Sequence, residues 1–404
     1  MRQIKSLLQR LGEQAVLFLK LGTIGFGGPA AHIAMMEEEV VQRRKWITRQ
    51  HFLDLVGATN FIPGPNSTEM AIHIGYLRAG WLGLVTAGVC FILPAVLIVA
   101  AFAWAYVTFG SLPEVAPFLY GIKPAVIAVI LGAVWRLGKT AMKGWRLIVV
   151  GIAVAVASVL GLNEVLALLS GGFIGMFWQG ISGRGKRASD GRGATGLLCL
   201  NIGGAFKRAK SSAVAVAALT GSAAGASVSV SLWKLGLFFL KIGAVLYGSG
   251  YVLVAFLEGG LVRDYGWLTQ QQLLDAVAIG QFTPGPVLST ATFIGYLVSG
   301  TPGALIATVS IFLPSFFFVA ALGPVIPHLR RYRWSSAFLD AINISAVALM
   351  AAVTVKLGRA TLTGWPAWLI ALGASGAAIR WKVNPAWIVL GGAIVGALLS
   401  SWIT

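Results

Sequence analysis

The sequence predicts an all-α polytopic membrane protein: two inverted-topology repeats with broken or re-entrant helices, joined by a basic linker. Three observations predict this fold. Of the 404 residues, 57% are hydrophobic and 11% are charged, whereas a soluble domain carries about 25% charged residues. The chain also contains an internal repeat. Finally, Lys and Arg are distributed unevenly among the loops, which indicates a fixed orientation in a lipid bilayer.

The internal repeat relates Phe18–Pro94 to Phe239–Pro314. Phe-Leu-Lys-Leu-Gly at 18–22 returns as Phe-Leu-Lys-Ile-Gly at 239–243, and Phe-Ile-Pro-Gly-Pro at 61–65 returns as Phe-Thr-Pro-Gly-Pro at 282–286. Two long matching halves indicate a duplication. The predicted domains are therefore an N-terminal repeat at 1–180, a basic linker with an inverting transmembrane helix at 181–232, and a C-terminal repeat at 233–404.

The first repeat begins with an apolar segment, Gln14–Met36, which is interrupted at Gly25–Pro29. Proline removes a backbone donor and glycine loosens a helix, so this segment is a broken helix or a re-entrant hairpin. The stretch Glu37–Gln50 is charged and interfacial. A second apolar segment, Phe52–Leu77, is broken by Pro-Gly-Pro. The uncharged run Trp81–Thr108 must span, and further spans are expected near 115–135, 147–162 and 165–178.

The linker at 180–210 is rich in Gly, Ser, Arg and Lys. We interpret it as a flexible tether near anionic lipid. Ala213–Leu232 is uncharged and long enough to cross the bilayer once, because about 20 residues are needed. The second repeat then follows the pattern of the first. Its spans are expected near 303–326, 335–355, 365–379 and 385–403.

The basic residues predict the orientation of the two repeats. In the first repeat they cluster at 2–10, 43–49 and 136–146, and the 110–113 loop has none. In the second repeat, three arginines at 330–333 occupy the place of that empty loop. By the positive-inside rule the repeats are upside down relative to each other, although Lys234, Lys356 and Arg359 do not fit. Orientation therefore explains the net charge of +18, and no nucleic-acid partner is expected.

The segments that repeat and break also resemble a known family. Phe26-Gly-Gly-Pro29, the Glu37 and Trp46 region, and the two Pro-Gly-Pro motifs with Gly75-Tyr76 and Gly295-Tyr296 are similar to motifs of the chromate ion transporter family, in its long-chain, two-domain members. The resemblance covers nearly the whole chain outside the linker. It implies an exporter of the chromate oxyanion in the bacterial inner (plasma) membrane that confers chromate resistance, with sulfate as a close substrate mimic.

The breaks also predict an anion site. A helix that restarts after a break presents unpaired N–H groups and about half a positive charge. A tetrahedral dianion carries only acceptors, so such a helix start suits it. The alternative is that the motifs only kink helices for packing. The predicted substrate-binding residues around the breaks are Phe26, Gly27, Gly28, Pro29, Asn60, Pro63, Gly64, Pro65, Asn66, Ser67, Thr68, Gln281, Pro284, Gly285, Pro286, Ser289 and Thr290.

Charged residues within apolar segments extend the candidate site. Lys20, Lys241 and Lys123 are added as substrate-binding candidates, because an intramembrane charge marks a functional pathway. The alternative for the first two is snorkelling from a membrane face. Glu69, Glu37 and Glu258 are proton-coupling candidates, with interfacial caps or salt bridges as the alternative for the latter two. Glu69 is the first candidate, because a carboxylate beside the Pro-Gly-Pro restart would repel a dianion unless it were protonated.

We therefore expect a secondary transporter that moves chromate outwards by alternating access. A sulfate or other anion transporter or channel is the alternative within transport. An intramembrane enzyme would need a nucleophile–base pair or a metal cluster, and a scaffold would not need duplicated broken helices. No catalytic residue, metal or cofactor is predicted. The expected partners are the anion and the lipid bilayer, with a homodimer left open.

Overall fold

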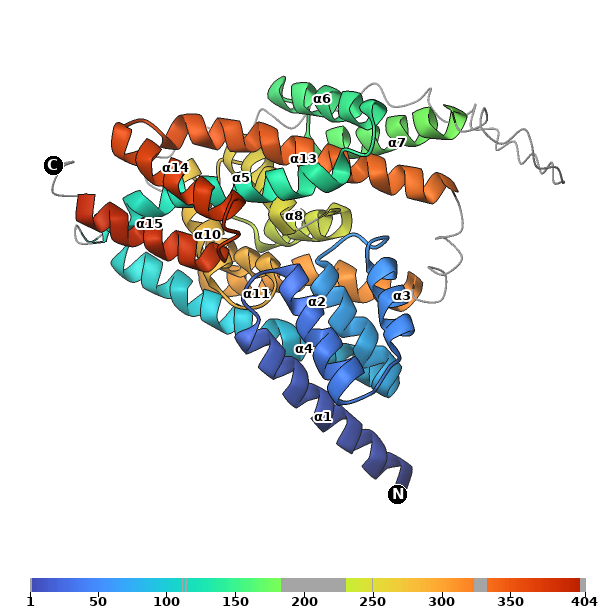
Figure 1. Ribbon diagram of the computed structural model, residues 1–404. Helices are drawn as coiled ribbons and strands as arrows, with labels where there is room; N and C mark the ends of the chain where they lie inside the picture. Colours follow the sequence, from blue (N-terminus) through green and yellow to red (C-terminus); the bar gives the residue numbers. More distant parts are fainter. Residues whose placement is uncertain are drawn as a thin grey trace, which may run out of the picture. The chain divides into compact units, whose positions relative to one another are not determined.

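The described chain is built from helices alone, as the sequence predicts for an all-α polytopic membrane protein (Figure 1). The computed structural model describes residues 2–110, 112, 115–182, 230–248, 250–322 and 333–399. The predicted linker and almost all of the predicted crossing at Ala213–Leu232 lie outside these residues.

Helices of the first repeat follow the predicted segments closely. The amino-terminal apolar segment forms α1 and α2, which are separated at the predicted break. The Pro-Gly-Pro motif separates α3 from α4. The elements are α1 (Arg2–Ile24), α2 (Pro29–Glu37), the π-helical turn η1 (Glu38–Arg43), α3 (Arg49–Thr59), α4 (Asn66–Phe109), α5 (Ala116–Ala141), α6 (Trp145–Val159) and α7 (Glu164–Ser182).

The second repeat has the corresponding helices in the same order, with two additional 3₁₀ turns, η3 and η5. Its π-helical turn begins at Glu258, next to the position that corresponds to the start of η1, and its Pro-Gly-Pro motif again precedes a long helix. The elements are α8 (Leu232–Val245), η3 (Gly250–Val252), α9 (Leu253–Leu257), η4 (Glu258–Asp264), α10 (Gln270–Phe282), η5 (Val287–Ser289), α11 (Thr290–Leu322), α13 (Arg333–Thr361), α14 (Trp365–Ile379) and α15 (Pro385–Leu399).

The long helices α4 and α11 each contain a sharp kink at corresponding positions. At Ala79–Gly80 and Ser299–Gly300 the backbone is not helical, and both glycines have positive φ, 61° and 62°. A residue with a side chain pays a steric cost in this conformation, whereas glycine adopts it freely. Each helix therefore consists of a short first segment and a long second segment.

A cluster of three side chains holds together the two ends of a helical hairpin formed by α3 and the first segment of α4. The Arg78 guanidinium lies 4.7 Å from the ring centroid of Trp46 and donates a 2.8 Å hydrogen bond to Glu13. Trp46 directly precedes α3, and Arg78 ends the first segment of α4. The two ends of the hairpin therefore lie together, and its tip is the Pro-Gly-Pro loop. The structure confirms the predicted break of Phe52–Leu77 at Pro-Gly-Pro.

Helix α1 runs parallel to the second segment of α4. The Gln14 side chain donates to the Gly83 carbonyl, and Gly22 lies directly against the Phe91 carbonyl. The second repeat has the same contact between Gly243 on α8 and the Ile311 carbonyl on α11. Glycine at such a helix contact lets two backbones approach closely. Since Gly22 reaches Phe91, α1 ends level with the middle of the second segment.

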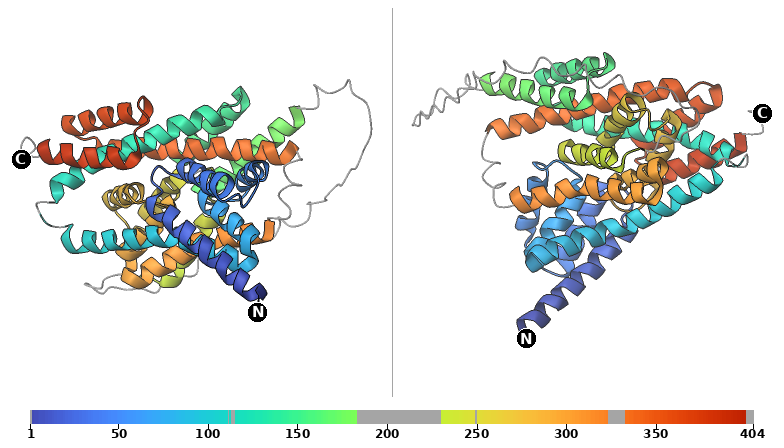
Figure 2. Two further views of the ribbon diagram at one scale, coloured as in Figure 1. Left: turned by 60° about the horizontal axis from the view of Figure 1, so that its bottom comes forward. Right: turned by 180° about the vertical axis from the view of Figure 1, so that it is seen from behind.

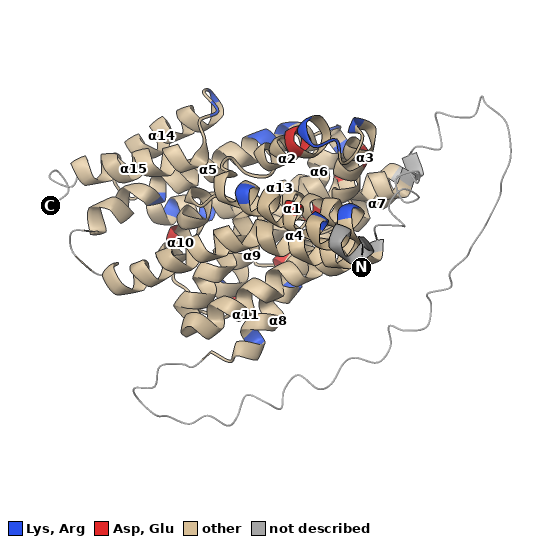
Figure 3. Cartoon of the chain, turned by 90° about the horizontal axis from the view of Figure 1, so that it is seen from below, with Lys and Arg blue, Asp and Glu red and all other residues tan. Residues whose placement is uncertain are grey.

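Four described helical segments are long and apolar enough to cross a membrane, namely Asn66–Phe109, Ala116–Ala141, Val287–Ala321 and Trp334–Thr361. The other apolar helices, α6, α7, α14 and α15, are shorter. Helix α5 packs against α13, α14 and α15, which come from the other repeat (Figure 2). Charged residues gather around α2 and α3, whereas α11, α14 and α15 contain none (Figure 3).

The parallel helix contacts yield a test with an internal control. Replacing Gly22 or Gly243 with alanine places a methyl group on a backbone carbonyl of the neighbouring helix. Overpacking of this kind costs about 1–3 kcal/mol, so the melting temperature of the purified protein in detergent should fall. Gly12 is exposed on α1 with nothing near its missing Cβ. Gly12→Ala should leave the melting temperature unchanged or raise it, and an equal fall in all three variants would contradict the contact.

Candidate functional site

The two Pro-Gly-Pro loops are held by the opposite repeat. The Gly64 N–H donates a 2.7 Å hydrogen bond to the Leu246 carbonyl, which belongs to the break after α8. The Gly285 N–H donates a 2.9 Å hydrogen bond to the Gly25 carbonyl, which belongs to the break after α1. The two bonds join corresponding positions of the repeats. Each loop is thus attached to the helix break of the other repeat, a crossed arrangement that we call the crossed loops.

Both loop glycines are tightly enclosed. Gly64 has a φ of 142° and lies against the Glu69 carboxyl and the Ser315 hydroxyl, so it has no space for a Cβ atom. Gly285 has a φ of 92°, and a Cβ there would lie 2.9 Å from the Ala95 Cβ. Ala95 and Ser315 occupy corresponding places in α4 and α11. Positive φ and close packing together explain why glycine stands at the centre of both motifs.

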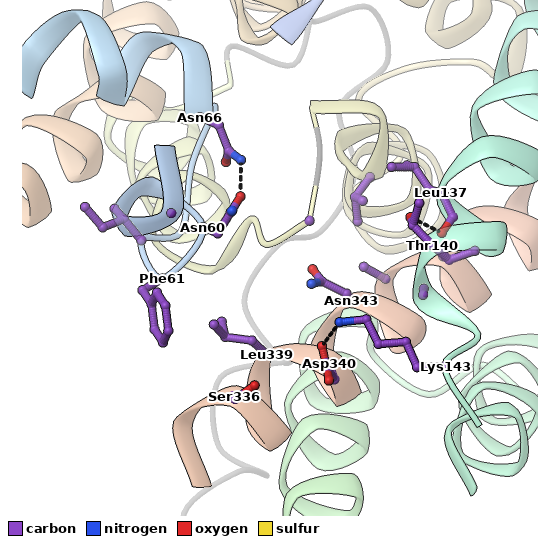
Figure 4. Close-up of a pocket in the computed structure, with 17 residues that line it drawn as sticks. Asn60, Phe61, Asn66, Leu137, Thr140, Lys143, Ser336, Leu339, Asp340 and Asn343 are labelled. Atoms are coloured by element: carbon purple, nitrogen blue, oxygen red, sulfur yellow. Dashed lines mark hydrogen bonds and ion pairs between the residues drawn. The ribbon is translucent and has the colours of Figure 1, made fainter. Parts of the chain in front are cut away.

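A cavity of about 580 Å³ lies beside the first Pro-Gly-Pro loop (Figure 4). The end of α3, the start of α4, the break after α8, the end of α5 and the middle of α13 contribute to its wall. Predicted binding residues Asn60 and Asn66 are among those that line it. Its lining residues are Gly57, Asn60, Phe61, Ile62, Asn66, Leu137, Thr140, Ala141, Lys143, Gly248, Val252, Ser336, Leu339, Asp340, Asn343, Ala346 and Val347.

The cavity wall carries several hydrogen-bond donors. Asn66 is the first residue of α4, so unpaired N–H groups and the positive end of the helix dipole lie at this wall. Its side-chain amide donates a 2.7 Å hydrogen bond to Asn60. Across the cavity, the Lys143 ammonium lies 2.7 Å from the Asp340 carboxylate (Figure 4). Asn343 lies beside Gly248 in the break. Amide, ammonium and helix-start donors are the groups that bind an oxyanion.

The remaining polar candidates near the breaks are buried and do not line this cavity. Ser67, Thr68 and Ser289 are at most 1% exposed, and their hydroxyl groups have no hydrogen-bond partner among the described residues. Thr290 donates to the Val287 carbonyl, and Gln281 is 8% exposed. The lining of this cavity does not include the first break, Phe26, Gly27, Gly28 and Pro29, or the second loop, Pro284, Gly285 and Pro286.

The three candidate lysines lie apart from this cavity. Lys20 forms a 3.0 Å ion pair with Glu39 and is half exposed. This hydrogen bond holds the pKa of the interfacial Glu39 below its usual value. Lys241 lines a separate cavity of about 380 Å³ with Glu164 and Asp264. The third, Lys123, interacts electrostatically with a buried acid of α10.

The three candidate acids have different surroundings. Glu37 lies 3.2 Å from the Arg49 guanidinium, and Glu258 forms an ion pair with Lys356. These contacts are the salt bridges that the sequence offers as the alternative to proton coupling. Glu69 is fully buried, and neither of its carboxyl oxygens has a hydrogen-bond partner in the described part of the chain.

Sequence reasoning missed Lys143, Asp340 and Asn343 as site residues. Lys143 belongs to the basic cluster at 136–146, which was used only for orientation. Asn343 corresponds to Lys123 in the repeat, and this polar replacement at a candidate position was the available signal. Asp340 lies far from Lys143 in the sequence, so their pairing had no local signal. Within the described ranges, no group of three His, Cys, Asp or Glu residues is arranged to hold a metal ion.

Comparison with known proteins identifies similar chains. The family model described as chromate transporter matches residues 13–176 and 233–397. A chromate transport protein of Cupriavidus metallidurans is 33% identical over 96% of this chain and 92% of its own length. A probable chromate transport protein of Synechococcus elongatus is 32% identical over 88% of this chain and 86% of its own length. No solved structure is significantly similar to the chain.

The enclosure of Gly64 predicts a large effect of a single methyl group. Gly64→Ala would force the new Cβ onto Glu69 and Ser315 in an unfavourable backbone conformation. We expect a loss of about 2–5 kcal/mol, the sum of overpacking and backbone strain, seen as a lower melting temperature and yield in detergent. Gly266 also has positive φ, 63°, but nothing lies near its missing Cβ. Gly266→Ala should therefore show the backbone cost alone, and equal losses in the two variants would contradict the tight enclosure.

Proposed function

The chain belongs to the chromate transporter family, and from this premise we propose that it is a secondary transporter that exports chromate by alternating access. In this proposal it resides in the bacterial inner membrane and confers chromate resistance. The two repeats, at 1–180 and 233–404, act as the moving halves. The proposed substrate is a tetrahedral dianion, and sulfate shares its charge and shape.

The observation that carries the proposal is the donor set of the 580 Å³ cavity. The start of α4 at Asn66, the Lys143 ammonium and the Asn343 amide surround one space (Figure 4). An oxyanion has only acceptor atoms, so each of these groups can serve it. The cavity is much larger than one such ion. Chromate would therefore bind with part of its hydration water, which can bridge to the wall.

The ion pair between Lys143 and Asp340 is suited to release its lysine to a substrate. The Lys143 side chain is 59% exposed and Asp340 is 22% exposed. An exposed pair of this kind contributes about 0–1 kcal/mol, so an arriving dianion can compete for the ammonium. Asp340 opposes anion binding both by repulsion and by holding Lys143. Lys143 therefore contributes to anion binding, and Asp340 lowers the affinity of the site for the anion.

The place of Lys143 supports outward transport. It follows the end of α5, within the basic segment at 136–146 that the positive-inside rule assigns to the cytoplasm. A cavity with this residue in its wall would receive its anion from the cytoplasmic side. Release on the opposite side then corresponds to export.

Repeat symmetry supports alternating access. The positions that correspond to Asn60 and Asn343 in the cavity are Gln281 and Lys123 in the other repeat. If the repeats exchange conformations, these two residues would line the outward-facing pathway. After this exchange, the second Pro-Gly-Pro loop and the first break, Phe26–Pro29, would lie beside the pathway through which the anion is released. The crossed loops couple the two changes, because each loop is bound to the other repeat's break.

Two variants of the cavity should change transport in opposite directions. In proteoliposomes, Lys143→Met should raise the KM for chromate about tenfold or more, because a charge-assisted hydrogen bond contributes about 1.5–3 kcal/mol. Asp340→Asn should lower the KM by up to about fivefold, because a repulsive and competing group worth up to about 1 kcal/mol is removed. Both are measured as initial rates of labelled chromate flux with excess sulfate as competitor.

Lys139 provides the matched control for Lys143. It lies one turn earlier on α5, exposed, and its ammonium stacks on Trp135 instead of lining the cavity. Lys139→Met should keep the wild-type KM. Chromate flux with the same KM in all three variants would refute the cavity as the substrate site. If the protein transports sulfate and not chromate, sulfate is the substrate and the chromate assignment is wrong.

A further inference from the structure

Glu69 is a buried carboxyl group without a hydrogen-bond partner among the described residues. It lies in the first turn of α4, four residues after Pro65, and is 0% exposed. Both carboxyl oxygens lack a hydrogen-bond partner within the described ranges. A bare carboxylate in such a place is costly, whereas the neutral acid is tolerated much better. The geometry is therefore that of a group that carries a proton in this conformation.

Glu69 lies between the crossed loops and the cavity wall. Its carboxyl group contacts Gly64 at the tip of the first Pro-Gly-Pro loop, and the Ser315 hydroxyl of α11 is close to the same point. Tyr247 in the break after α8 is near enough to interact with it electrostatically. The next residue in the break, Gly248, lines the cavity, as does Asn66 one turn before Glu69. The carboxyl group thus lies against the loop and near residues that line the anion cavity.

None of the elements packed against α4 supplies a basic partner for Glu69. Helix α11 and η5 contain no charged residue. On α1, Lys20 is paired with Glu39, and Glu13 with Arg78. Three further basic residues, Arg2, Lys5 and Arg10, lie in the first half of α1, and Arg10 is exposed. The other titratable groups of these elements are His32 and Glu37 on α2, Arg49, His51 and Asp54 on α3, and Asp275 on α10. His73 follows Glu69 by one turn on α4 itself, buried, with its Nε2 atom unpartnered.

Most of these histidines and acids interact with described groups other than Glu69. His32 is hydrogen-bonded to the Gly25 carbonyl, Glu37 is paired with Arg49, and Asp275 accepts from Tyr106 in the second segment of α4. His51 lies near enough to His73 to interact with it electrostatically. Asp54 lies within reach of Gln50, on the exposed side of α3. Among the residues that the structure describes, no cation is therefore paired with Glu69 to hold it as a carboxylate.

We propose that Glu69 binds the proton that is transported together with each anion, which deepens the proposed function and rests on it. A dianion in the cavity and a carboxylate behind its wall repel each other, so anion binding favours the protonated acid. By linkage, protonation of Glu69 favours anion binding to the same extent. The O–H bond forms with a proton that cavity water relays from the solution on the side of uptake. It breaks when the anion leaves, and the proton passes to the solution on the side of release. One proton thus accompanies one dianion, and the net charge moved is −1.

The test measures how many charges move with each anion. Proteoliposomes are held at a potassium-diffusion potential of about 59 mV without a pH gradient, and the equilibrium chromate ratio is measured. A net charge of −1 gives a tenfold ratio, whereas −2 gives a hundredfold ratio. Wild-type protein should give tenfold with chromate-linked proton movement, reported by a pH-sensitive dye against protein-free liposomes. Glu69→Gln, which imitates the neutral acid, should give hundredfold without proton movement.

Glu38 supplies the control carboxyl, because its side chain is 51% exposed and paired with Arg43. Glu38→Gln should keep the tenfold ratio. A wild-type ratio of hundredfold without proton movement overturns the role of Glu69 and leaves chromate transport standing. So does a Glu69→Gln protein that keeps the tenfold ratio, or one that is monodisperse but carries no chromate. Absence of chromate flux in the wild type overturns the proposed function itself.

A measurement on the wild type alone covers the case in which Glu69→Gln does not fold. Chromate is added to the purified protein in weakly buffered detergent solution at alkaline pH, and uptake of protons is recorded. About one proton per bound chromate is expected from the linkage. Binding of chromate without proton uptake would overturn the proposal.

Discussion

The structure depends on one pair of hydrogen bonds, in which each repeat holds the Pro-Gly-Pro loop of the other. The Gly64 and Gly285 amides donate to the carbonyls of Leu246 and Gly25. Backbone groups exposed by a broken helix must find partners when water is excluded. A break in one repeat leaves carbonyls free, and the loop in the other leaves N–H groups free. The duplication therefore supplies both the carbonyls and the N–H groups. In the first repeat the Gly25 carbonyl also has a hydrogen-bond contact with the His32 ring of the same repeat.

The two repeats share a backbone arrangement but differ in polar and charged residues at corresponding positions. These differences determine where the candidate site lies. Asn343 and Lys123 correspond, as do Asp340 and Tyr120, and Glu69 corresponds to the Ser289–Thr290 region. The Lys143–Asp340 ion pair lies in the described cavity. Lys123 does not line this cavity and interacts electrostatically with the buried Asp275 of α10. A perfectly symmetric duplication would have two equal sites. The substitutions instead give the described conformation a cavity that is lined by amides of both repeats, with the Glu69 carboxyl group close to its wall.

Much of the fold could be predicted from the sequence, because its determinants are local. Glycine and proline predict the breaks at Gly25–Pro29 and Pro63–Pro65, and the structure confirms both. The cross-repeat bonds could not be predicted, because a constant offset identifies equivalent residues and not which residues touch. For the same reason Lys143 and Asp340 were missed, whereas Asn60 and Asn66 were found beside the motif. The lysines Lys20 and Lys241 were selected for charge alone, and the structure places both away from the cavity.

The central claim is that the anion binds where the first Pro-Gly-Pro loop meets the break of the second repeat. The most direct test is a structure of the protein with chromate bound, in which anomalous scattering locates the chromium atom. The account predicts a single chromium in the cavity between Asn66, Lys143 and Asn343, within hydrogen-bond distance of donors on both repeats. Chromium bound only at the separate cavity beside Lys356 and Arg359 would contradict it.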